Sequence, residues 1–598
     1  MTLLPIAPPR TFDVARRHVY KSAMKYFWLS CLAGLSVLGC SDDSELRSAA
    51  SAGGSDSGSG AVSDVGGIGD TGIIRGPITG DITHYNYTFD LATRHATAGI
   101  DVQVAFPGGD CFSTGLELPA LSGTTWNGAP ARTVSVMNNA VQICGNGVAA
   151  GTPLGITGGV TVPSATFLGL DVGFSTKRDL SGGNFTYLMS WIGGCDHFGP
   201  CDTAPSKLAS YQFTVTHGAS DVVLCPGDRT TGSGMTQCSL GAGTSALAPI
   251  YSSFAIASDP LWVRNDFVTA AGVNVVFYEV PAGRIARFLD PTSVSAFLTW
   301  ITGLLGPYPY GTQLRVAGAP TKWLGFEHPG NIIVDQRLPF SGPYQDSGMH
   351  VFMHETIHQW AGDRTTIASV LDFGWKEATA EYLSYVFEDE QRPVGEAATS
   401  LLYWSAVSLD RQHFLRPTDS PAPAIQDFYG DVYTTGAMMY VQLETLLGRQ
   451  KVIDGIKSLL VAPGAKSFDD LRHVLEVSSG ANLAPYFSAW VFGSGKPEWP
   501  TFAIATSQTG NQVTVTLTQQ NASHKLYGCK VEIQVRGATS SAVALVDFGV
   551  APTSATASAT VTLAEPVVDA VFEPRHRVIG RVAGAPVVMA PVGQVWPL

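Results

Sequence analysis

The chain has 598 residues, more than one hydrophobic core usually serves, so we expect two to four domains. Glycine (65) and proline (36) are plentiful and only 14% of the residues are charged, which is typical of β-rich globular domains with many turns. The net charge of −13 argues against nucleic acid or an anionic membrane surface as a partner. Nor does the sequence contain a basic tract with interleaved aromatic residues.

The first forty residues indicate an export signal. Lys21 and Lys25 precede the apolar run "YFWLSCLAGLSVLG", which is too short to span a bilayer comfortably and is followed by Cys40. A small residue before a cysteine at the end of such a run resembles a bacterial lipoprotein cleavage site. Acylation of Cys40 would then anchor an exported protein to the membrane by its N-terminus. A freely secreted protein is the alternative.

Residues 41–79 follow as an expected linker, because "SAASAGGSDSGSGAVSDVGGIGD" is small, polar and without an apolar face. Export also favours disulfide bonds. Six of the seven cysteines after Cys40 lie between residues 111 and 238, and sequence order suggests three pairs among the fifteen pairings possible. These pairs are Cys111–Cys144, Cys195–Cys201 and Cys225–Cys238. Cys529 is left over, and we expect it to be a buried free thiol.

Residues 80–258 are predicted to form an all-β domain. Short alternating stretches such as "HYNYTFDL", "GIDVQVAF" and "ASYQFTVTH" are separated by Gly, Pro, Asn and Asp turns. The pattern changes near residue 259, where strands and helices begin to mix. The strand-like segments "GVNVVFYEV" and "GNIIVDQ" lie ahead of the first two of these helices.

The first helix of the mixed region should begin after Asp290, which can cap it, with Pro291 in its first turn. Apolar residues then recur at helical spacing in "VSAFLTWITGLL". Further helices are expected over residues 347–361, 374–388, 395–411 and 434–448. After residue 501 alternation returns in "NQVTVTLTQQ" and "KVEIQVRG", which predicts a small β-sandwich over residues 501–598. The predicted fold class is therefore multidomain α+β.

The stretch "FMHETIHQW" carries a candidate metal site. On a helix, His354 and His358 stand one turn apart on the same face, so both imidazoles can reach one ion. Glu355 lies beside the first histidine but projects differently, which lets it address a bound water instead of the metal. Water-activating zinc enzymes divide the work in this way.

A third ligand should come from the next helix. Ala361 and Arg364 stand where a further glycine and histidine would be needed, so a three-histidine site is excluded. Glu377 lies nineteen residues after His358 on a stretch with good helical period. One turn later, Glu381 points the same way and could orient a ligand imidazole. A solvated helix face is the alternative for both glutamates.

These residues resemble a known family. "HETIHQWAGD" and "WKEATAEY", with eighteen residues between His358 and Glu377, are similar to the aminopeptidase N family of gluzincin zinc metallopeptidases. The resemblance implies one zinc ion held by His354, His358 and Glu377, with Glu355 as the general base. It also implies a thermolysin-like α/β catalytic domain over residues 259–500 and a peptide or protein substrate.

Two further stretches resemble the family in the same order. "LGFEHPGNIIV" is similar to the segment that receives a peptide's free amino terminus, so Glu327 would bind the substrate α-ammonium. "VYTTGAMMYVQLETLLG" is similar to the entry of the helix that carries the family's tyrosine, so Tyr433 would donate to the developing oxyanion. Without this resemblance, a surface-strand carboxylate and a core tyrosine would be the simpler interpretations.

The chain also departs from the family. Leu324, Phe326 and His328 stand in the amine-binding segment where the family prefers Gly, Met and Asn. Ser190 or Trp191 stands where many members carry a second amine-binding glutamine. The sequence ends at residue 598, so we expect the family's large helical C-terminal domain to be lacking. An endopeptidase or a small-molecule hydrolase with the same zinc site, and a non-catalytic surface-tethered binding scaffold, are alternatives to an aminopeptidase.

Overall fold

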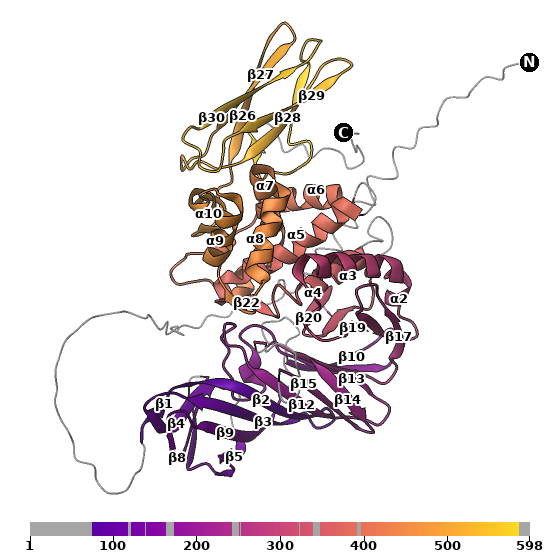
Figure 1. The fold of residues 1–598 in the computed structure, drawn as a ribbon, viewed down its shortest axis with the longest axis vertical. Helices are drawn as coiled ribbons and strands as arrows, with labels where there is room; N and C mark the ends of the chain where they lie inside the picture. The colour runs from indigo at the N-terminus through magenta and orange to yellow at the C-terminus, as the bar shows by residue number, and fades with distance from the viewer. Residues whose placement is uncertain are drawn as a thin grey trace, which may run out of the picture.

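The structure is a computed structural model in which the chain forms several separate β-sheets and a group of helices (Figure 1). The predicted signal and almost all of the predicted linker lie outside the described residues. Within the described part, no helix is both long and apolar enough to cross a membrane. The described residues are 75–117, 121–137, 139–162, 173–241, 250–251, 253–321, 323–338, 347–391 and 396–584.

The N-terminal part of the described chain, up to residue 259, is built almost wholly from strands. Its largest sheet has the order β14-β15-β12-β2-β3-β9-β5-β6. Alternate side chains of β2 face the core, so Tyr85, Tyr87 and Phe89 are buried. Tyr211 of β12 stacks on Tyr85. The strands are β14 (Asp228–Gly232), β15 (Met235–Leu240), β12 (Ser210–Thr216), β2 (Gly80–Asp90), β3 (His95–Val104), β9 (Pro153–Thr161), β5 (Ser122–Trp126) and β6 (Ala129–Pro130).

Two four-stranded sheets complete this N-terminal part. The first has the order β1-β4-β8-β7 and the second the order β10-β11-β16-β13. Their strands are β1 (Pro77–Ile78), β4 (Gly108–Gly115), β8 (Ala140–Ala149), β7 (Thr133–Met137), β10 (Gly173–Arg178), β11 (Asn184–Met189), β16 (Ala255–Asp259) and β13 (Val222–Leu224). The short 3-10 helix η1 spans Cys195–His197.

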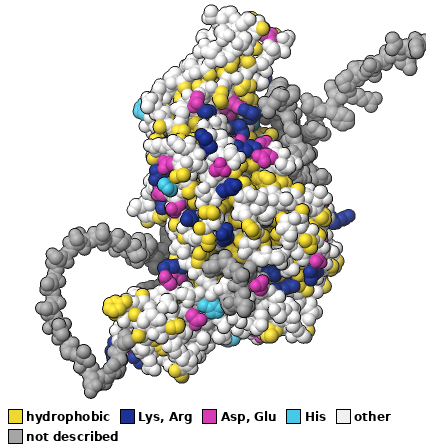
Figure 2. Space-filling view, in the orientation of Figure 1, with side chains coloured by type: hydrophobic (Ala, Val, Ile, Leu, Met, Phe, Trp, Pro, Cys, Tyr) yellow, Lys and Arg dark blue, Asp and Glu magenta, His cyan; other side chains and the backbone are white. Residues whose placement is uncertain are grey.

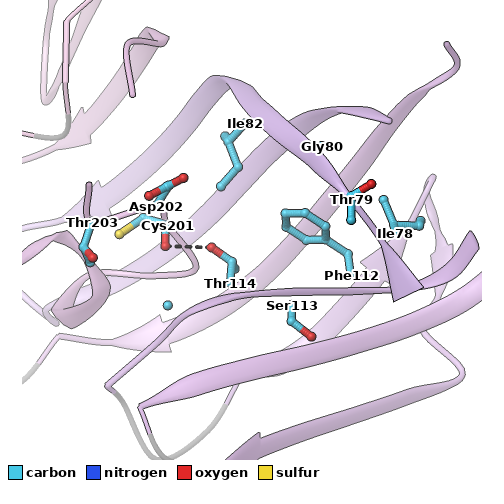
Figure 3. Close-up of a pocket in the computed structure, with 11 residues that line it drawn as sticks. Ile78, Thr79, Gly80, Ile82, Phe112, Ser113, Thr114, Cys201, Asp202 and Thr203 are labelled. Carbon is cyan, nitrogen blue, oxygen red and sulfur yellow. Dashed lines mark hydrogen bonds between the residues drawn. The ribbon is translucent and has the colours of Figure 1, made fainter. Parts of the chain in front are cut away.

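The disulfide pairs suggested by sequence order are confirmed, and Cys529 is a buried free thiol as predicted. The loop closed by Cys195–Cys201 lies beside a hollow in this part of the molecule (Figure 3). There the Thr114 hydroxyl donates to the Cys201 carbonyl at 2.7 Å, and the Gly115 amide donates to the same oxygen at 3.0 Å. These bonds tie the loop that follows Trp191 to strand β4.

The middle of the chain contains a five-stranded sheet with the order β17-β18-β19-β21-β20. The three inner strands run parallel, and the two edge strands are antiparallel to their neighbours. The strands are β17 (Val263–Val268), β18 (Asn274–Glu279), β19 (Gln313–Ala319), β21 (Asn331–Asp335) and β20 (Gly325–His328). Two-stranded pairs join β22 (Thr365–Ile367) to β24 (Gly464–Lys466) and β23 (Arg416–Pro417) to β25 (Phe492–Gly493).

The helices of the middle part follow the sequence pattern at their starts more closely than at their ends. Asp290 caps α3 as predicted, since its Oδ1 accepts from the amides of Thr292 and Ser293. The helix predicted over 347–361 ends four residues earlier than expected. The helices predicted over 374–388 and 395–411 each begin within one residue of the expected start. The helices are α2 (Ile285–Phe288), α3 (Pro291–Leu305), α4 (Ser347–Ile357), η2 (Val370–Asp372), α5 (Phe373–Gln391) and α6 (Glu396–Ser408).

The helix predicted over 434–448 is considerably longer, because α7 (Ile425–Leu447) begins nine residues earlier. Ile425, Phe428 and Val432 lie at helical spacing and are buried, so the earlier start was missed although a local signal is present. Helices α7 and α5 approach closely at Gly436, where a Cβ atom would lie 2.5 Å from that of Ala378. Among the described residues, four α-helices were not predicted: α2, α8 (Arg449–Leu460), α9 (Phe468–Ser479) and α10 (Ala484–Trp490).

The described C-terminal residues form two further sheets, with the orders β30-β27-β26-β32 and β29-β28-β31. As predicted, Val513, Val515 and Leu517 share one buried face of β27. The indole of Trp490 donates to the Gly528 carbonyl at 3.0 Å and so joins these sheets to the helices below them in Figure 1. The strands are β26 (Thr501–Thr509), β27 (Gln512–Gln519), β28 (Lys530–Arg536), β29 (Ser541–Asp547), β30 (Thr556–Thr562), β31 (Asp569–Phe572) and β32 (Arg581–Val582).

The surface of the helical region carries charges of both signs. On the face shown in Figure 2, lysine and arginine side chains alternate with aspartate and glutamate over the middle of the molecule. Arg449 illustrates this mixing, because its guanidinium contacts Asp389, Glu390 and Glu444. Such mixed charges hold helix ends together and create no extended field of one sign.

Candidate metal centre

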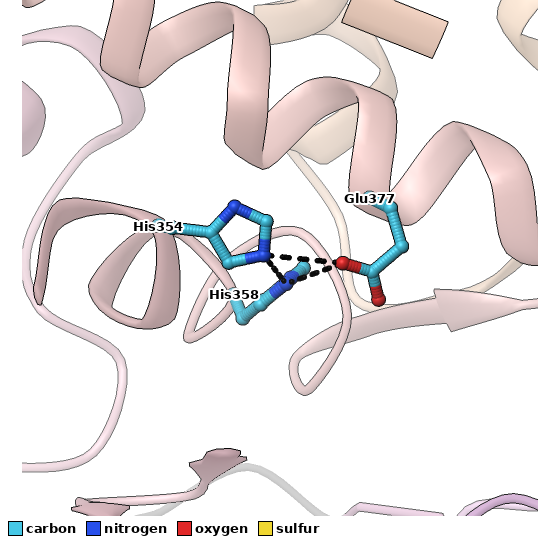
Figure 4. A group of neighbouring side chains, drawn as sticks. All are labelled: His354, His358 and Glu377. Carbon is cyan, nitrogen blue, oxygen red and sulfur yellow. Dashed lines mark hydrogen bonds and ion pairs between the residues drawn. The ribbon is translucent and has the colours of Figure 1, made fainter. Parts of the chain in front are cut away.

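The predicted metal ligands converge at one point between α4 and α5. His354 lies on the last turn of α4 and His358 directly after it, and Glu377 reaches down from α5 (Figure 4). The Nε2 atoms of the two histidines are 3.0 Å apart, and Oε2 of Glu377 lies 3.1 Å from the first and 3.2 Å from the second. Three donor atoms therefore form a compact triangle.

This triangle fits a zinc ion. Zinc binds imidazole nitrogen and carboxylate oxygen at about 2.0–2.2 Å, so two ligands of a tetrahedral site lie roughly 3.3–3.6 Å apart. The observed separations are only slightly tighter, and all three side chains are buried. Three protein ligands leave a fourth position for water or substrate, as catalytic zinc sites require.

The histidine atoms that face away from the triangle have partners that orient the rings. His358 Nδ1 donates to the Ala361 carbonyl at 2.9 Å, and His354 Nδ1 lies 3.4 Å from Oε1 of Glu381. Both contacts place a proton on Nδ1 and leave the Nε2 lone pair directed at the centre. Glu381 therefore lies where the sequence predicted a group that orients a ligand.

A histidine that the sequence analysis missed lies behind Glu381. His350 Nε2 is 3.1 Å from Oε2 of Glu381, and its Nδ1 is 2.7 Å from Oε1 of Glu388. Burial alone would lower the pKa of His350, but the two carboxylates outweigh it and raise that pKa well above its ordinary value. A cationic His350 thus holds Glu381 in place from the side opposite His354.

The electrostatic surroundings suit metal binding. Burial would raise the pKa of Glu377, but Lys376 and the two imidazoles outweigh it and hold that pKa well below its usual range. Burial, together with the charge of Lys376, lowers the pKa of His358. One ligand is thus a carboxylate and one a neutral imidazole, which are the forms that bind zinc.

Glu355, the predicted general base, is buried beside the triangle. A carboxylate oxygen of Glu355, one of Glu327 and a ring nitrogen of His358 all lie within 4.8 Å of one another. Space for the Glu355 carboxylate is created by Gly325 of strand β20, where a Cβ atom would lie 2.1 Å from Glu355 Oε1. Burial and the neighbouring carboxylates of Glu327 and Glu377 raise the pKa of Glu355 well above its ordinary value, so this carboxylate takes up a proton readily.

Glu327 is a buried residue of β20 and does not lie on a surface strand. Its Oε1 atom accepts a 2.6 Å hydrogen bond from the ammonium group of Lys376. The same ammonium donates to Oε1 of Glu377 at 2.8 Å, the oxygen that faces away from the triangle. The lysine was not predicted as a site residue, because a single basic residue beside a ligand carries no signal in the sequence.

Tyr433, the predicted oxyanion donor, lies on α7 with its ring centroid 6.0 Å from that of His354. The two rings are inclined by only 25°. Burial, followed by the charges of Glu377, Glu327 and Glu355, raises the pKa of Tyr433 well above its ordinary value. The phenol therefore keeps its proton and can donate it.

Aromatic side chains of the N-terminal part, the five-stranded sheet and the helices cluster near the start of α5. Trp191 lies 5.6 Å, centroid to centroid, from Phe373, which begins α5, and 6.0 Å from Tyr429 of α7. Trp323 lies 6.2 Å from Trp191 and stacks on Phe326 at 4.3 Å. Trp191 thus brings an apolar indole to the segment where the resembling family carries an amide side chain.

Two neighbouring histidines, a glutamate from the following helix and a carboxylate beside them have the arrangement of a gluzincin-type metal site. Comparison with known proteins agrees with this class. Residues 304–490 match the peptidase family M1 domain. The chain thus carries a peptidase family M1 domain, and its resemblance to the aminopeptidase N-like gluzincins is confirmed.

One curated relative and one solved structure extend the comparison. Aminopeptidase N of Lactobacillus delbrueckii subsp. lactis is 26% identical over 159 residues, which are 25% of this chain and 19% of that protein. The fold is similar to that of Legionella pneumophila aminopeptidase A, solved in complex with aspartic acid, with a TM-score of 0.66 and 15% identity. That match covers 85% of this chain and 60% of the other. The chain therefore spans only part of each relative.

Proposed function

We propose that this protein is a zinc-dependent metallopeptidase, and that it acts as an aminopeptidase that releases N-terminal residues from peptides. The observation that carries the proposal is the buried triangle of His354, His358 and Glu377 with Glu355 beside it. A site built only to stabilise the fold would not need a further carboxylate of raised pKa beside the three ligands.

The residues of the site have separate tasks in peptide-bond hydrolysis. A zinc ion held by the three ligands would make water acidic and polarise the scissile carbonyl. Glu355 takes the proton from the attacking water and passes it to the leaving amine. Tyr433 donates its phenolic proton in a hydrogen bond to the oxygen that becomes negatively charged. Glu327 faces the end of the substrate that precedes the scissile bond.

The domain arrangement is proposed to follow from the same resemblance. Residues 259–500 would be a thermolysin-like catalytic domain, between an N-terminal β domain over residues 80–258 and a C-terminal β-sandwich over residues 501–598. The support is the placement of the proposed catalytic side chains on β20, α4, α5 and α7, with His358 directly after the end of α4. The sheets before and after these elements supply neighbours and no ligand.

Export and anchoring through Cys40 remain part of the proposal. They are supported by the apolar run ahead of Cys40 and by the three disulfides between residues 111 and 238, which are typical of an oxidising compartment. Metabolic labelling with a fatty acid should mark the protein, and Cys40→Ala should remove the label. Unchanged labelling of that variant would contradict acylation at Cys40.

Product analysis tests the peptidase proposal directly. The full-length protein, loaded with zinc, is incubated with unmodified peptides, and the products are identified by mass spectrometry with and without a chelator. We expect stepwise loss of N-terminal residues that stops on chelation. Internal cuts would identify an endopeptidase instead. No cleavage by a fully zinc-loaded protein would contradict the peptidase proposal and favour a small-molecule hydrolase or a binding scaffold.

A further inference from the structure

Gln359, the residue after the second histidine of the triangle, is fully buried just past the end of α4. Its Nε2 atom donates to the His328 carbonyl at 3.1 Å and to Oδ2 of Asp363 at 3.0 Å. Its Oε1 atom accepts from the Gly330 amide at 2.9 Å and from the Tyr308 hydroxyl at 3.1 Å. A primary amide has two donor and two acceptor positions, so all of them are used and the side chain is held in one orientation.

Two of these bonds hold the turn between strands β20 and β21. The strands pair antiparallel with Pro329 and Gly330 as the turn between them, and Gly330 has a φ of +73°. Proline followed by glycine suits such a turn, since proline fixes the first φ and glycine accepts a positive one. Gln359 bonds this turn at the His328 carbonyl and the Gly330 amide. It therefore holds the end of the strand that carries Glu327.

The same turn is held from another direction by Arg315 of β19. The Arg315 amide donates to the Gly330 carbonyl at 3.0 Å, and its Nε atom donates to Oδ1 of Asn331 at 2.5 Å. Its Nη2 atom donates to the Gly227 carbonyl of the N-terminal part at 2.6 Å. The turn is thus tied to β19 and to the N-terminal part, and the glutamine adds a tie to the metal centre.

This tie sets a distance within the site. The backbone of Gln359 continues directly from the proposed ligand His358, and the carbonyl that its side chain holds belongs to the residue after Glu327. A substrate whose amino end meets Glu327 and whose scissile carbonyl meets the metal position has to span the gap between them. A shift of about 1 Å in such a gap costs roughly a hundredfold in rate, so a rigid link is needed.

We propose that Gln359 is a positioning residue, which holds Glu327 at a set distance from the metal centre and so fixes where a peptide's amino end lies relative to the bond that is cut. This inference rests on the proposed aminopeptidase function and deepens it at the same site. Gln359 acts through strand β20 and does not itself touch the substrate. Its loss should therefore weaken recognition of the amino end more than hydrolysis itself.

The test compares one peptide in two forms, with a free and with an acetylated amino terminus, on the full-length zinc-loaded protein. The measured quantity is the ratio of kcat/KM for the free peptide to that for the acetylated peptide. For the wild type we expect a ratio of about ten or more, the value of one charge-assisted hydrogen bond at Glu327. A ratio near one would show that Glu327 does not recognise the amino end, and would overturn the inference while leaving hydrolysis by the metal centre intact.

Gln359→Met keeps the length of the side chain and removes its four hydrogen bonds. The ratio should fall by about tenfold, while kcat/KM for the acetylated peptide stays within about threefold of the wild type. Zinc content should not change, because Gln359 is not a ligand. An equal fall on both peptides would mean that Gln359 only stabilises the fold, and would overturn the inference.

Gln442→Met is the matched control. Gln442 is also buried, and its amide donates to the Tyr486 hydroxyl at 3.1 Å and accepts from the Ile579 amide at 2.9 Å. Its loss should lower stability but leave the ratio of the two peptides as in the wild type. A ratio that falls as far in this control as in Gln359→Met would overturn the inference, because any buried glutamine would then have the same effect.

Gln359→Asn provides the same comparison if Gln359→Met does not fold. It keeps the amide but shortens the side chain by one carbon, so the ratio should fall by about threefold or more. An unchanged ratio in a folded Gln359→Asn variant would overturn the inference.

A double variant shows whether Gln359 acts through Glu327. Glu327→Gln should bring the ratio near one, and adding Gln359→Met should not change it further. A further change of about threefold or more would show another route and would overturn the inference. If the zinc-loaded wild type cleaves neither peptide, the proposed function is contradicted, and the inference with it.

Discussion

Glu377 divides its two carboxylate oxygens between two partners. Oε2 faces the imidazoles of His354 and His358, whereas Oε1 accepts from Lys376. The lysine therefore fixes the orientation of the carboxylate and keeps it ionised. A single side chain, that of Lys376, links the proposed metal ligand Glu377 to Glu327.

Glu355 is the residue whose replacement should separate metal binding from catalysis. Glu355→Gln preserves size but removes the proton acceptor, so kcat should fall by about a thousandfold, within the range typical of general-base catalysis. Zinc content, measured by elemental analysis, should stay at the wild-type level because Glu355 is not a ligand. Substantial peptide hydrolysis by this variant would contradict the assigned role.

His350 should influence the affinity for zinc without touching the ion. His350→Gln removes the positive charge that holds Glu381 behind His354, and we expect zinc affinity to fall by about 10–100-fold. Competition with a chromogenic chelator measures this affinity. His473→Gln, at an exposed position on α9, is the control. Equal affinities in both variants would show that the contact through Glu381 has no effect.

Sequence reasoning reached the ligands because their spacing is local. His354 and His358 are one helix turn apart, so periodicity places them on one face, and the family resemblance singled out Glu377 on the next helix. Lys376 and His350 were missed for the opposite reason. Their partners Glu327 and Glu388 are 49 and 38 residues away, and no pattern within one segment reveals such contacts.

Gly325 of strand β20 leaves room for the Glu355 carboxylate because glycine has no side chain. A Cβ atom at Gly325 would lie 2.1 Å from Glu355 Oε1, so Gly325→Ala must displace that carboxylate. A general base misplaced by about 1 Å costs roughly a hundredfold in rate, and we expect kcat to fall by about that factor with zinc content unchanged. Steady-state kinetics on a zinc-loaded sample provide the measurement.

The matched control for this glycine lies on α3. A Cβ atom at Gly303 would have no neighbour within 4 Å, so Gly303→Ala should keep full activity. Replacing glycine by alanine inside a helix should also stabilise the protein by about 0.5–1 kcal/mol. Full activity of Gly325→Ala would show that Glu355 has space which the structure does not indicate.

Asp259, the last residue of β16, should make the free energy of unfolding depend on pH. Burial, followed by the nearby charge of Asp179, raises the pKa of Asp259 from 3.8 to about 6. The folded state then holds a proton more tightly than the unfolded chain does, so this contribution to stability is complete below pH 3.8 and is lost as pH rises to about 6.

Asp259→Asn imitates the protonated carboxyl and removes this dependence. We expect its thermal midpoint to exceed that of the wild type by about 1–3 °C at pH 7.5 and to match it near pH 4. Calorimetry at the two pH values gives the comparison. A variant destabilised equally at both values would mean that Asp259 contributes as a carboxylate.

Helix boundaries show where local patterns stop being informative. The cap at Asp290 and the proline after it gave the start of α3, because both act within the first turn. The start of α7 at Ile425 could not be found in the same way. Ala424 at its N-cap position has no side chain that could cap the helix, although Ile425, Phe428 and Val432 keep the apolar period of its first turns.

At the scale of the molecule, the parts before and after the catalytic elements hold the metal centre from both sides. From the N-terminal part, Trp191 packs edge-on against Phe373 at the start of α5. From the C-terminal part, Arg577 donates to Glu444 at 2.7 Å, and the same glutamate accepts from Tyr382 of α5 at 2.9 Å. The helix that carries Glu377 is thus fixed at its start and along its length.

The most direct test of the zinc peptidase account is a titration of metal-free protein with zinc while peptide hydrolysis is followed. Activity should rise in proportion to the added zinc and level off at one equivalent per chain, because one triangle of ligands holds one ion. His354→Ala, which lacks one ligand, should stay inactive throughout. Hydrolysis that does not depend on zinc, or one bound equivalent without hydrolysis, would contradict the account.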